Sequence, residues 1–292
     1  MPTFERPGGA SLRVPGRVLT DYHVHLRPDE DDTPPEEYFT PGNAERYREV
    51  AEDRGIAELG VAEHIHRFTQ SLDIWQHPWW RKWARDDVDA YCEFVREETD
   101  MRLGIEADFV AGAEDRTANF LDAREWDFVV GSVHFLRDEA VDMDDWSVWG
   151  RGYSAEKVWK RYFDTIGEAA RTGMFDIMAH PDLVKVWGRD APQPEGDLRR
   201  YYEPAVEGFL EGGVAVEVST AGLRKPVGEI YPSRRFLEVV VDAGLPIALS
   251  SDAHEPDQVG HRYDEALELL EEVGIGELCV FERRSRRLEP IG

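Results

Sequence analysis

The sequence predicts an α/β protein, a distorted (β/α)7 barrel with a functional site at the C-terminal mouth. Seven short runs rich in apolar and β-branched residues are each followed by a longer amphipathic segment. The runs are apolar almost throughout, as expected for parallel strands that are covered on both faces. No linker divides the chain, so residues 1–292 are expected to form a single domain. An open doubly wound sheet is the alternative, but no GxGxxG motif follows the first run.

The seven predicted strands are bounded by turn residues or by the amphipathic segments that follow them. Most of them end in a histidine or an acidic residue, which places polar side chains at one end of the sheet. In chain order they are RVLTDYHVH (17–25), AELGVAEHIH (57–66), RLGIEADFV (102–110), WDFVVGSVHF (126–135), FDIMAHPD (175–182), VAVEVST (214–220) and PIALSSDAH (246–254).

The segments between the strands have the apolar spacing and the end signals of helices. Asn43 is a plausible cap for the first, and Ser154 and Gly173 bound the longest. Pro204 is expected to kink or restart the helix that contains it, because proline lacks an N–H donor. The predicted helices are 42–55, 85–99, 154–173, 197–213, 233–244 and 261–274.

The composition excludes several classes of partner and compartment. A formal net charge of -26 repels nucleic acid and anionic lipid, so neither is an expected partner. The two cysteines imply no disulfide framework, and no apolar run resembles a secretory signal or a membrane span. These features together predict a soluble cytoplasmic protein. They predict no particular oligomeric state.

Two short motifs at opposite ends of the chain carry the same spacing. TDYHVHL contains His23 and His25, and SSDAH contains Asp252 and His254. Residues i and i+2 of a strand point to the same face, so the members of each pair project together. The first and last strands of a closed barrel are neighbours. The two pairs are therefore expected to converge at the C-terminal mouth, where barrel enzymes place their sites.

Four further candidate ligands end the strands in between. In order from strand two to strand five, they are His64, Glu106, His134 and His180. Neutral imidazoles interleaved with carboxylates suit zinc, manganese or iron. At least eight candidate ligands are too many for one ion. We therefore expect two or three divalent metal ions, with a carboxylate such as Glu106 bridging two of them.

Cationic and aromatic side chains beside these ligands are candidates for substrate contact. His66 shares a face with His64, and it and Arg67 are candidates to line the site. Arg224 and Lys225 follow strand six. In so acidic a chain, a cationic pair beside metal ions suggests a bound anion, because arginine binds phosphate oxygens through two N–H groups. The alternative is a loop cation that pairs with a nearby carboxylate.

Other polar residues near the strand ends are expected to have supporting roles. Glu63 should point away from the mouth and act in a cap or a salt bridge. Asp108, two residues beyond Glu106, could support a ligand. His77 lies in a tryptophan-rich stretch and is expected to pack or to cover the site, and His261 is expected at the surface.

These motifs together resemble the PHP (polymerase and histidinol phosphatase) family of metal-dependent phosphoesterases. The HxH start, GIEADF, SVHF, AHPD and the closing SSDAH carry the resemblance, which spans roughly residues 19–272. Within the family, the chain is most similar to the monofunctional histidinol-phosphatase branch. The stretches that match this branch are GSVHFL (131–136), STAGLRKPVGEIYP (219–232) and SSDAHEPDQVG (250–260).

The resemblance implies a trinuclear site. The implied ligands are His23, His25, Glu106 and Asp252 for the first metal, Glu106, His134 and His180 for the second, and His64 and His254 for the third. The family commonly adds a His or Asp shortly after the HxH pair. Here LRPDEDD stands in that place, so Asp29 or Asp31 must supply the ligand.

The resemblance also implies a phosphomonoester hydrolase, with L-histidinol phosphate of histidine biosynthesis as the expected substrate. Arg224 is expected to hold the phosphate, and Asp252 and His254 to take part in catalysis. The acidic segment 29–37 could contact the cationic end of the substrate. The alternatives are a PHP phosphoesterase for another small ester, an amidohydrolase-type hydrolase that cleaves C–N or C–O bonds, and a non-catalytic metal-binding protein.

Overall fold

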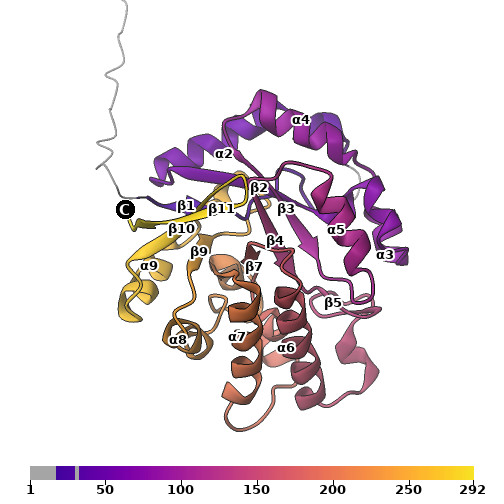
Figure 1. The fold of residues 1–292 in the computed structure, drawn as a ribbon, viewed down its shortest axis with the longest axis vertical. Helices are drawn as coiled ribbons and strands as arrows, with labels where there is room; N and C mark the ends of the chain where they lie inside the picture. Colours follow the sequence, from indigo (N-terminus) through magenta and orange to yellow (C-terminus); the bar gives the residue numbers. More distant parts are fainter. Residues whose placement is uncertain (1–17, 30–32) are drawn as a thin grey trace, which may run out of the picture.

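The structure, a computed structural model, describes residues 18–29 and 33–292. At its centre lies a sheet of seven parallel strands in the order β1-β2-β3-β4-β7-β8-β9 (Figure 1). The strands are β1 (Thr20–Asp21), β2 (Glu58–His64), β3 (Arg102–Asp108), β4 (Phe128–Ser132), β7 (Ile177–Met178), β8 (Ala215–Ser219) and β9 (Ile247–Ser250). Each lies inside one predicted run, so the predicted seven-unit α/β barrel is confirmed.

The sheet nearly closes through residues just beyond β1 and β9. Val24 pairs with Ala253 in a parallel bridge. The backbone N–H of His25 donates to the carbonyl oxygen of Ala253 over 2.7 Å, and that of Ala253 donates to His23 over 3.2 Å. The first and last strands are therefore neighbours, as the sequence predicts. This pairing brings the two edges of the parallel sheet, β1 and β9, next to each other.

All six predicted helices are present, and the structure adds three that the sequence did not indicate. Thr40, not Asn43, caps α2, because its side chain accepts the backbone N–H of Asn43. Ser154 caps α6 as predicted. The helices are α1 (Pro35–Tyr38), α2 (Pro41–Asp53), α3 (Pro78–Trp83), α4 (Val88–Glu98), α5 (Glu114–Asp122), α6 (Ala155–Arg171), α7 (Arg199–Gly212), α8 (Arg234–Asp242) and α9 (Tyr263–Glu272). None of the helices in the described residues is long and apolar enough to cross a membrane.

Helices α6 and α7 pack backbone against backbone on the outside of the barrel. A Cβ added to Gly208 would lie 2.5 Å from the carbonyl oxygen of Gly167, so only glycine fits there. Pro204 was expected to kink or restart its helix; it does not restart it, because α7 continues through it. Proline removes a single N–H from the helix, and the close packing against α6 holds the residues on both sides of it.

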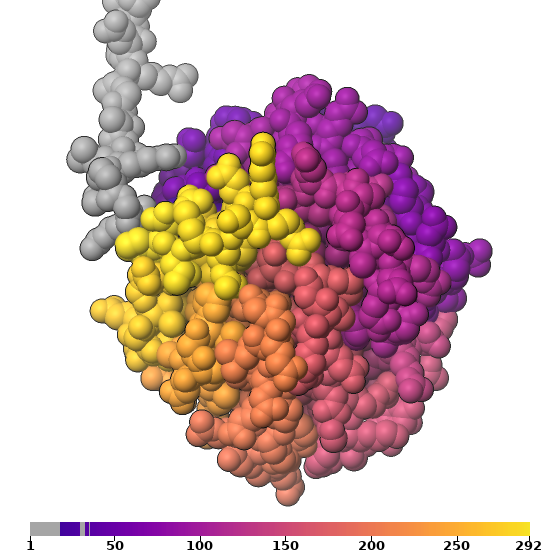
Figure 2. All heavy atoms as spheres, viewed as in Figure 1, coloured from indigo at the N-terminus to yellow at the C-terminus, as the bar shows by residue number. Residues whose placement is uncertain are grey.

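A C-terminal hairpin that the barrel pattern did not include seals the other end of the barrel. It consists of β10 (Glu277–Glu282) and β11 (Ser285–Pro290), which pair antiparallel. Cys279 and Phe281 pack into the barrel against Tyr22 and Phe128. The hairpin (yellow) lies across the sheet in Figure 1, and its atoms contact segments from both halves of the chain in Figure 2.

The hairpin turn fixes which end of the barrel is sealed. The backbone N–H of Arg284 donates to the carbonyl oxygen of Asp127, the residue just before β4. The Arg284 side chain also donates to Met174, shortly before β7. Both acceptors lie at the N-terminal ends of strands. The open mouth is therefore the C-terminal end, where the candidate ligands gather.

Candidate metal centre

The two histidines after β1 lie side by side with the two polar residues after β9. The Nε2 atom of His25 is 3.4 Å from the Oδ1 atom of Asp252, and that of His23 is 3.8 Å from it. Both imidazoles are 0% exposed. The convergence predicted from the i, i+2 spacing is thus present, because the Val24–Ala253 bridge holds the two segments in register.

Glu106, at the end of β3, occupies the middle of the cluster. Its Oε2 atom is 3.3 Å from the Nε2 atom of His23 and also contacts His64. Its Oε1 atom is 3.2 Å from the Nε2 atom of His180 and 3.4 Å from that of His134. Oε2 also lies 3.7 Å from the Nε2 atom of His25. The two oxygens therefore face different sets of imidazoles, which is the arrangement that a bridging carboxylate needs.

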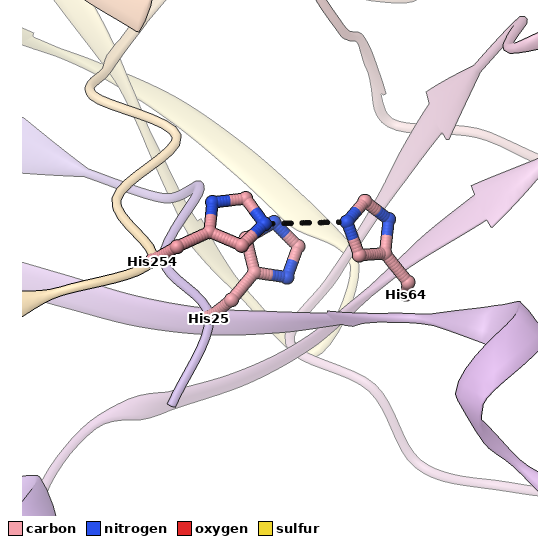
Figure 3. A group of neighbouring side chains, drawn as sticks. All are labelled: His25, His64 and His254. Carbon is pink, nitrogen blue, oxygen red and sulfur yellow. Dashed lines mark hydrogen bonds between the residues drawn. The ribbon is translucent and has the colours of Figure 1, made fainter. Parts of the chain in front are cut away.

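His25, His64 and His254 form a further group of neighbouring imidazoles. His25 and His254 stack with their ring centroids 4.2 Å apart, and the Nε2 atoms of His64 and His254 are 3.4 Å apart (Figure 3). Of the two acids proposed for this group, Asp29 has its Oδ1 atom 3.4 Å from the Nε2 atom of His254. Asp31 lies outside the described residues.

In the described part of the chain, several buried nitrogen and oxygen atoms of the cluster make no hydrogen bond, which is expected of atoms that bind metal ions. Within the described residues, buried ring nitrogens of His23, His25 and His64 and one oxygen of Glu106 make no hydrogen bond. Buried polar atoms normally have partners. Four overlapping sets have ligand atoms within 4.8 Å of one another: His25, His64 and His254; His23, His25 and Asp252; His23, Glu106 and His180; and His64, Glu106 and His134. Imidazole and carboxylate donors at this density suit zinc, manganese or iron.

Carboxylates behind the imidazoles orient two of them. The Nδ1 atom of His23 donates to Glu217 on β8, and the Nδ1 atom of His134 lies equally close to Asp108, both at 2.7 Å. Such pairs fix the tautomer of a ligating histidine and leave Nε2 free for the metal. Asp108 therefore has the supporting position expected of it. Glu217 was missed, although a lone glutamate inside the apolar run VAVEVS is the signal that could have found it.

Two candidate ligands have backbones in the left-handed region, with φ of 25° at His180 and 52° at Asp252. Such conformations cost free energy in residues other than glycine and persist where the surroundings enforce them. The backbone N–H of His180 donates to Glu217 over 2.6 Å. The Arg224 guanidinium donates to the carbonyl oxygens of Ser251 and Asp252, both over 2.8 Å.

Glu63 acts in a salt bridge beneath the cluster, as expected. It accepts the backbone N–H groups of Leu26 and Arg27 over 2.6 and 3.0 Å, and it pairs with Arg67 over 2.8 Å. Burial alone would raise the pKa of this carboxyl, but His25 and Arg67 outweigh it and lower the pKa to about 2. The segment after the HxH pair is therefore anchored to β2 by an ionised carboxylate.

The protonation of the imidazoles reflects burial and nearby carboxylates. Burial lowers the pKa of His64 well below its usual value, and it lowers the pKa of His66 and His254 to about 4. These rings are neutral at pH 7, as metal ligation requires. Burial acts in the same direction on His134, but the charges led by Asp108 prevail and raise its pKa to about 10.

A cavity of about 490 Å³ opens above the cluster. Its lining includes five of the candidate ligands (His64, His134, His180, Asp252 and His254), together with Asp29. Of the residues expected to contact substrate, His66, Arg67 and Lys225 line this cavity, whereas Arg224 is not part of its lining. Trp79 and Trp83, from the tryptophan-rich stretch, form part of its wall. A larger hollow of about 1070 Å³, lined partly by α8 and α9, contains none of the candidate ligands.

The other two histidines outside the cluster have structural positions. His77 caps α3 through its Nδ1 atom and stacks on Trp75 with ring centroids 4.5 Å apart. It packs, as expected, and it does not line the cavity over the cluster. His261 is partly exposed, close to the surface position predicted for it.

A nearly closed parallel barrel with a buried cluster of histidines and carboxylates at its C-terminal mouth defines a class of α/β-barrel proteins with a candidate multinuclear metal centre. The PHP domain model matches residues 40–221 of this chain. A curated relative from Deinococcus radiodurans, a probable histidinol-phosphatase, is 31% identical over 278 residues, which is 93% of this chain and 99% of the relative. The chain therefore belongs to the PHP domain family.

Other relatives and solved structures agree with this assignment. The histidinol-phosphatase of Bacillus subtilis is 28% identical over 188 residues, 59% of this chain and 70% of the relative. The crystal structure of histidinol phosphate phosphatase from Lactococcus lactis, complexed with Zn, L-histidinol and phosphate, matches with a TM-score of 0.66 and 17% identity, covering 92% of this chain and 98% of that one. A putative histidinol phosphatase from Listeria monocytogenes gives a TM-score of 0.68 and 18% identity over 85% and 99% of the chains. These structures support the fold.

Proposed function

We propose that this protein is a metal-dependent phosphomonoester hydrolase that converts L-histidinol phosphate and water to L-histidinol and phosphate. The observation that carries the proposal is the cluster around Glu106, whose two oxygens face separate sets of imidazoles at the floor of a cavity. The names of the curated relatives support the choice of substrate.

We further propose that the cluster holds three divalent ions, of zinc, manganese or iron. Glu106 would bridge the first two, and Asp29, whose Oδ1 atom lies 3.4 Å from the Nε2 atom of His254, would complete the third site. When bound, these ions would polarise the phosphate oxygens and lower the pKa of the attacking water. The proposed ligands are His23, His25, Glu106 and Asp252 for the first ion, His134 and His180 with Glu106 for the second, and His64, His254 and Asp29 for the third.

The remaining site residues bind and orient the ester. Lys225 lines the cavity and presents the ammonium group that an anion needs there. Arg224 holds the backbone at Asp252 through one Nη atom, while its other Nη atom is buried and makes no hydrogen bond within the described residues. Arg224 does not line the cavity as it stands, so we propose that this Nη turns towards a phosphate oxygen of the bound ester, where it would stabilise developing negative charge. Asp252 could accept a proton from the attacking water and pass it to the departing alcohol.

The cavity sets the size of the substrate. Its volume of about 490 Å³ lies within the usual range for small-molecule sites and suits a phosphorylated metabolite. His66 and Arg67 form part of the wall near the rim. Arg67 is 2% exposed and paired with Glu63 and Asp29, so we assign it to the support of Asp29 as much as to the substrate.

We also propose that residues 1–292 act as a single cytoplasmic domain without a nucleic-acid or membrane partner. The strongly negative net charge of -26 supports this. The test is the salt dependence of binding to DNA, RNA and anionic vesicles. Tight binding at 150 mM salt would contradict it.

The first experiment compares phosphate release from L-histidinol phosphate, p-nitrophenyl phosphate and a nucleoside monophosphate, using zinc- or manganese-loaded protein. We expect kcat/KM for L-histidinol phosphate to exceed the others by ~100-fold, about 2.7 kcal/mol of differential transition-state stabilisation. Glu106→Gln should abolish release, whereas Glu97→Gln, at an exposed position of α4, should not. Equal kcat/KM on all three esters would refute L-histidinol phosphate as the preferred substrate but would leave the phosphoesterase activity supported. No release from any ester by metal-loaded protein would refute both.

A further inference from the structure

Asp142 lies in a loop beside the cluster of candidate ligands and lines the same cavity. It follows the short hairpin of β5 (Phe135–Leu136) and β6 (Glu139–Ala140), which begins one residue after His134. The backbone N–H of Val141 donates to the carbonyl oxygen of His134 over 2.9 Å. The carbonyl oxygen of Val141 accepts the indole N–H groups of Trp187 and Trp149 over 2.9 and 3.3 Å. These bonds fix Asp142 relative to a candidate ligand.

One oxygen of the Asp142 carboxylate lacks a hydrogen-bond partner among the described residues. Asp142 lines the cavity over the cluster, and this oxygen, Oδ1, is buried. None of the four metal-compatible sets includes it. Lys225 lines the same cavity. In the described residues, 18–29 and 33–292, it forms no ion pair with Asp142. A buried carboxylate oxygen without a donor is costly unless a ligand supplies one.

The other acids of the cavity are already engaged. Asp252 faces His23 and His25, and Asp29 pairs with Arg67 over 2.7 Å. The acidic segment 29–37 was expected to contact the cationic end of the substrate. Asp29, the acid of this segment that lines the cavity in the described residues, is already paired with Arg67. Residues 30–32 lie outside the described chain. Asp142 is left as the cavity acid that can accept from a substrate cation.

The wall next to Asp142 is apolar. Met143, Leu183, Val186 and Trp187 line the cavity on the segments that flank it. A carboxylate in an apolar wall attracts a cation more strongly than one in water, because the local dielectric constant is lower. A substrate with an ammonium group beside an apolar or aromatic body would match this wall.

We infer that Asp142 is a specificity-determining residue that binds the primary ammonium group of the substrate. The inference rests on the proposed function. In L-histidinol phosphate, two carbon atoms separate the ester oxygen from the ammonium nitrogen, so a phosphate at the metals places the ammonium close to them. Asp142 is tied through Val141 to the ligand His134 and lies at the edge of that region.

The test uses a substrate pair that differs only in the ammonium group: L-histidinol phosphate and 3-(imidazol-4-yl)propyl phosphate. Both esters have an alkyl alcohol as leaving group. A variant that only impairs protonation of the leaving group should therefore slow the hydrolysis of both esters equally. Asp142→Asn is compared with Asp144→Asn, which removes the same charge at an exposed position on the same loop. Circular dichroism and thermal unfolding establish that each variant is folded, and Asp142→Ser provides a second substitution.

We expect the wild type to prefer the amino ester by ~10- to 100-fold in kcat/KM, the range of a charge-assisted hydrogen bond. Both Asp142 variants should reduce this preference to within ~3-fold, mainly by slowing the amino ester, while Asp144→Asn keeps it. A preference that persists in folded Asp142 variants overturns the inference. Equal loss on both esters also overturns it. If the wild type hydrolyses p-nitrophenyl phosphate but shows no activity on the amino ester, the proposed function fails instead.

Discussion

Glu217 is the residue whose replacement, compared with that of a matched buried acid, should most sharply distinguish an effect on metal binding from an effect on folding. It is 1% exposed and accepts three hydrogen bonds: from His23 Nδ1 over 2.7 Å, from the backbone N–H of His180 over 2.6 Å, and from Ser250 over 2.5 Å. It thereby orients a proposed ligand of the first ion and fixes the backbone of a ligand of the second.

Glu217→Gln keeps the shape of the side chain and removes its charge. The amide oxygen can replace Oε1, which accepts from both His23 and Ser250. The NH₂ group then takes the place of Oε2 and faces the N–H of His180, so one charge-assisted hydrogen bond is lost, about 1.5–3 kcal/mol. Loss of a carboxylate behind a ligating histidine typically weakens metal affinity by ~10- to 100-fold. We expect both effects together.

The assay is metal affinity by competition with a chelator, beside chemical denaturation of the metal-free protein. Asp127→Asn is the matched control. Asp127 is also buried and also accepts three hydrogen bonds, but it lies at the sealed end of the barrel. Both variants should lose stability, and only Glu217→Gln should lose metal affinity. Wild-type affinity in Glu217→Gln, or an equal loss in the control, would refute this reasoning.

Three further predictions concern acid stability, helix packing and metal removal. Arg96 and backbone donors outweigh burial and hold the pKa of Asp127 below its usual value. Its contribution is therefore present above about pH 4 and is lost as pH falls through the lowered value. Denaturant titrations should show the wild type and Asp127→Asn converging in stability at acid pH; a gap that widens there would contradict the sign. Gly208→Ala places a Cβ 2.5 Å from a backbone oxygen of α6 and should destabilise by ~1–3 kcal/mol, measured by denaturation. An unchanged midpoint would show that the helices separate freely. Dialysis against a chelator should abolish phosphate release and lower Tm, because ions that bind only the folded state stabilise it. Re-addition of zinc or manganese should restore both, and full activity in metal-free protein would contradict the proposed centre.

The cluster of candidate metal ligands could be predicted from the sequence because its geometry follows from local rules. The i, i+2 spacing puts His23 with His25 and Asp252 with His254 on common faces. Barrel closure then makes the two pairs neighbours, and the structure confirms this through the Val24–Ala253 bridge. No long-range information beyond the closure itself was needed.

The supporting residues could not be predicted in the same way. The sequence places Glu217 in a strand but does not say which distant imidazole and backbone N–H it meets. It leaves Asp29 and Asp31 as alternatives, and it assigns Arg224 to phosphate without indicating the carbonyl oxygens that the guanidinium contacts. Asp142 follows a hairpin that has no barrel periodicity. Each of these contacts joins segments far apart in the chain.

The sequence by itself determined the seven βα units, the order of the strands and the side chains that gather at the C-terminal mouth. The reason is that strand and helix periodicity, together with the end of each strand, are local properties of the chain. Only the tertiary structure decided which carboxylates orient the imidazoles and that the C-terminal hairpin seals the opposite end. It also decided that Asp142 lines the cavity with one oxygen that makes no hydrogen bond in the described part of the chain. Those features depend on how closed strands and long loops pack in space, and hydrogen-bond partners across such distances are set by that packing alone.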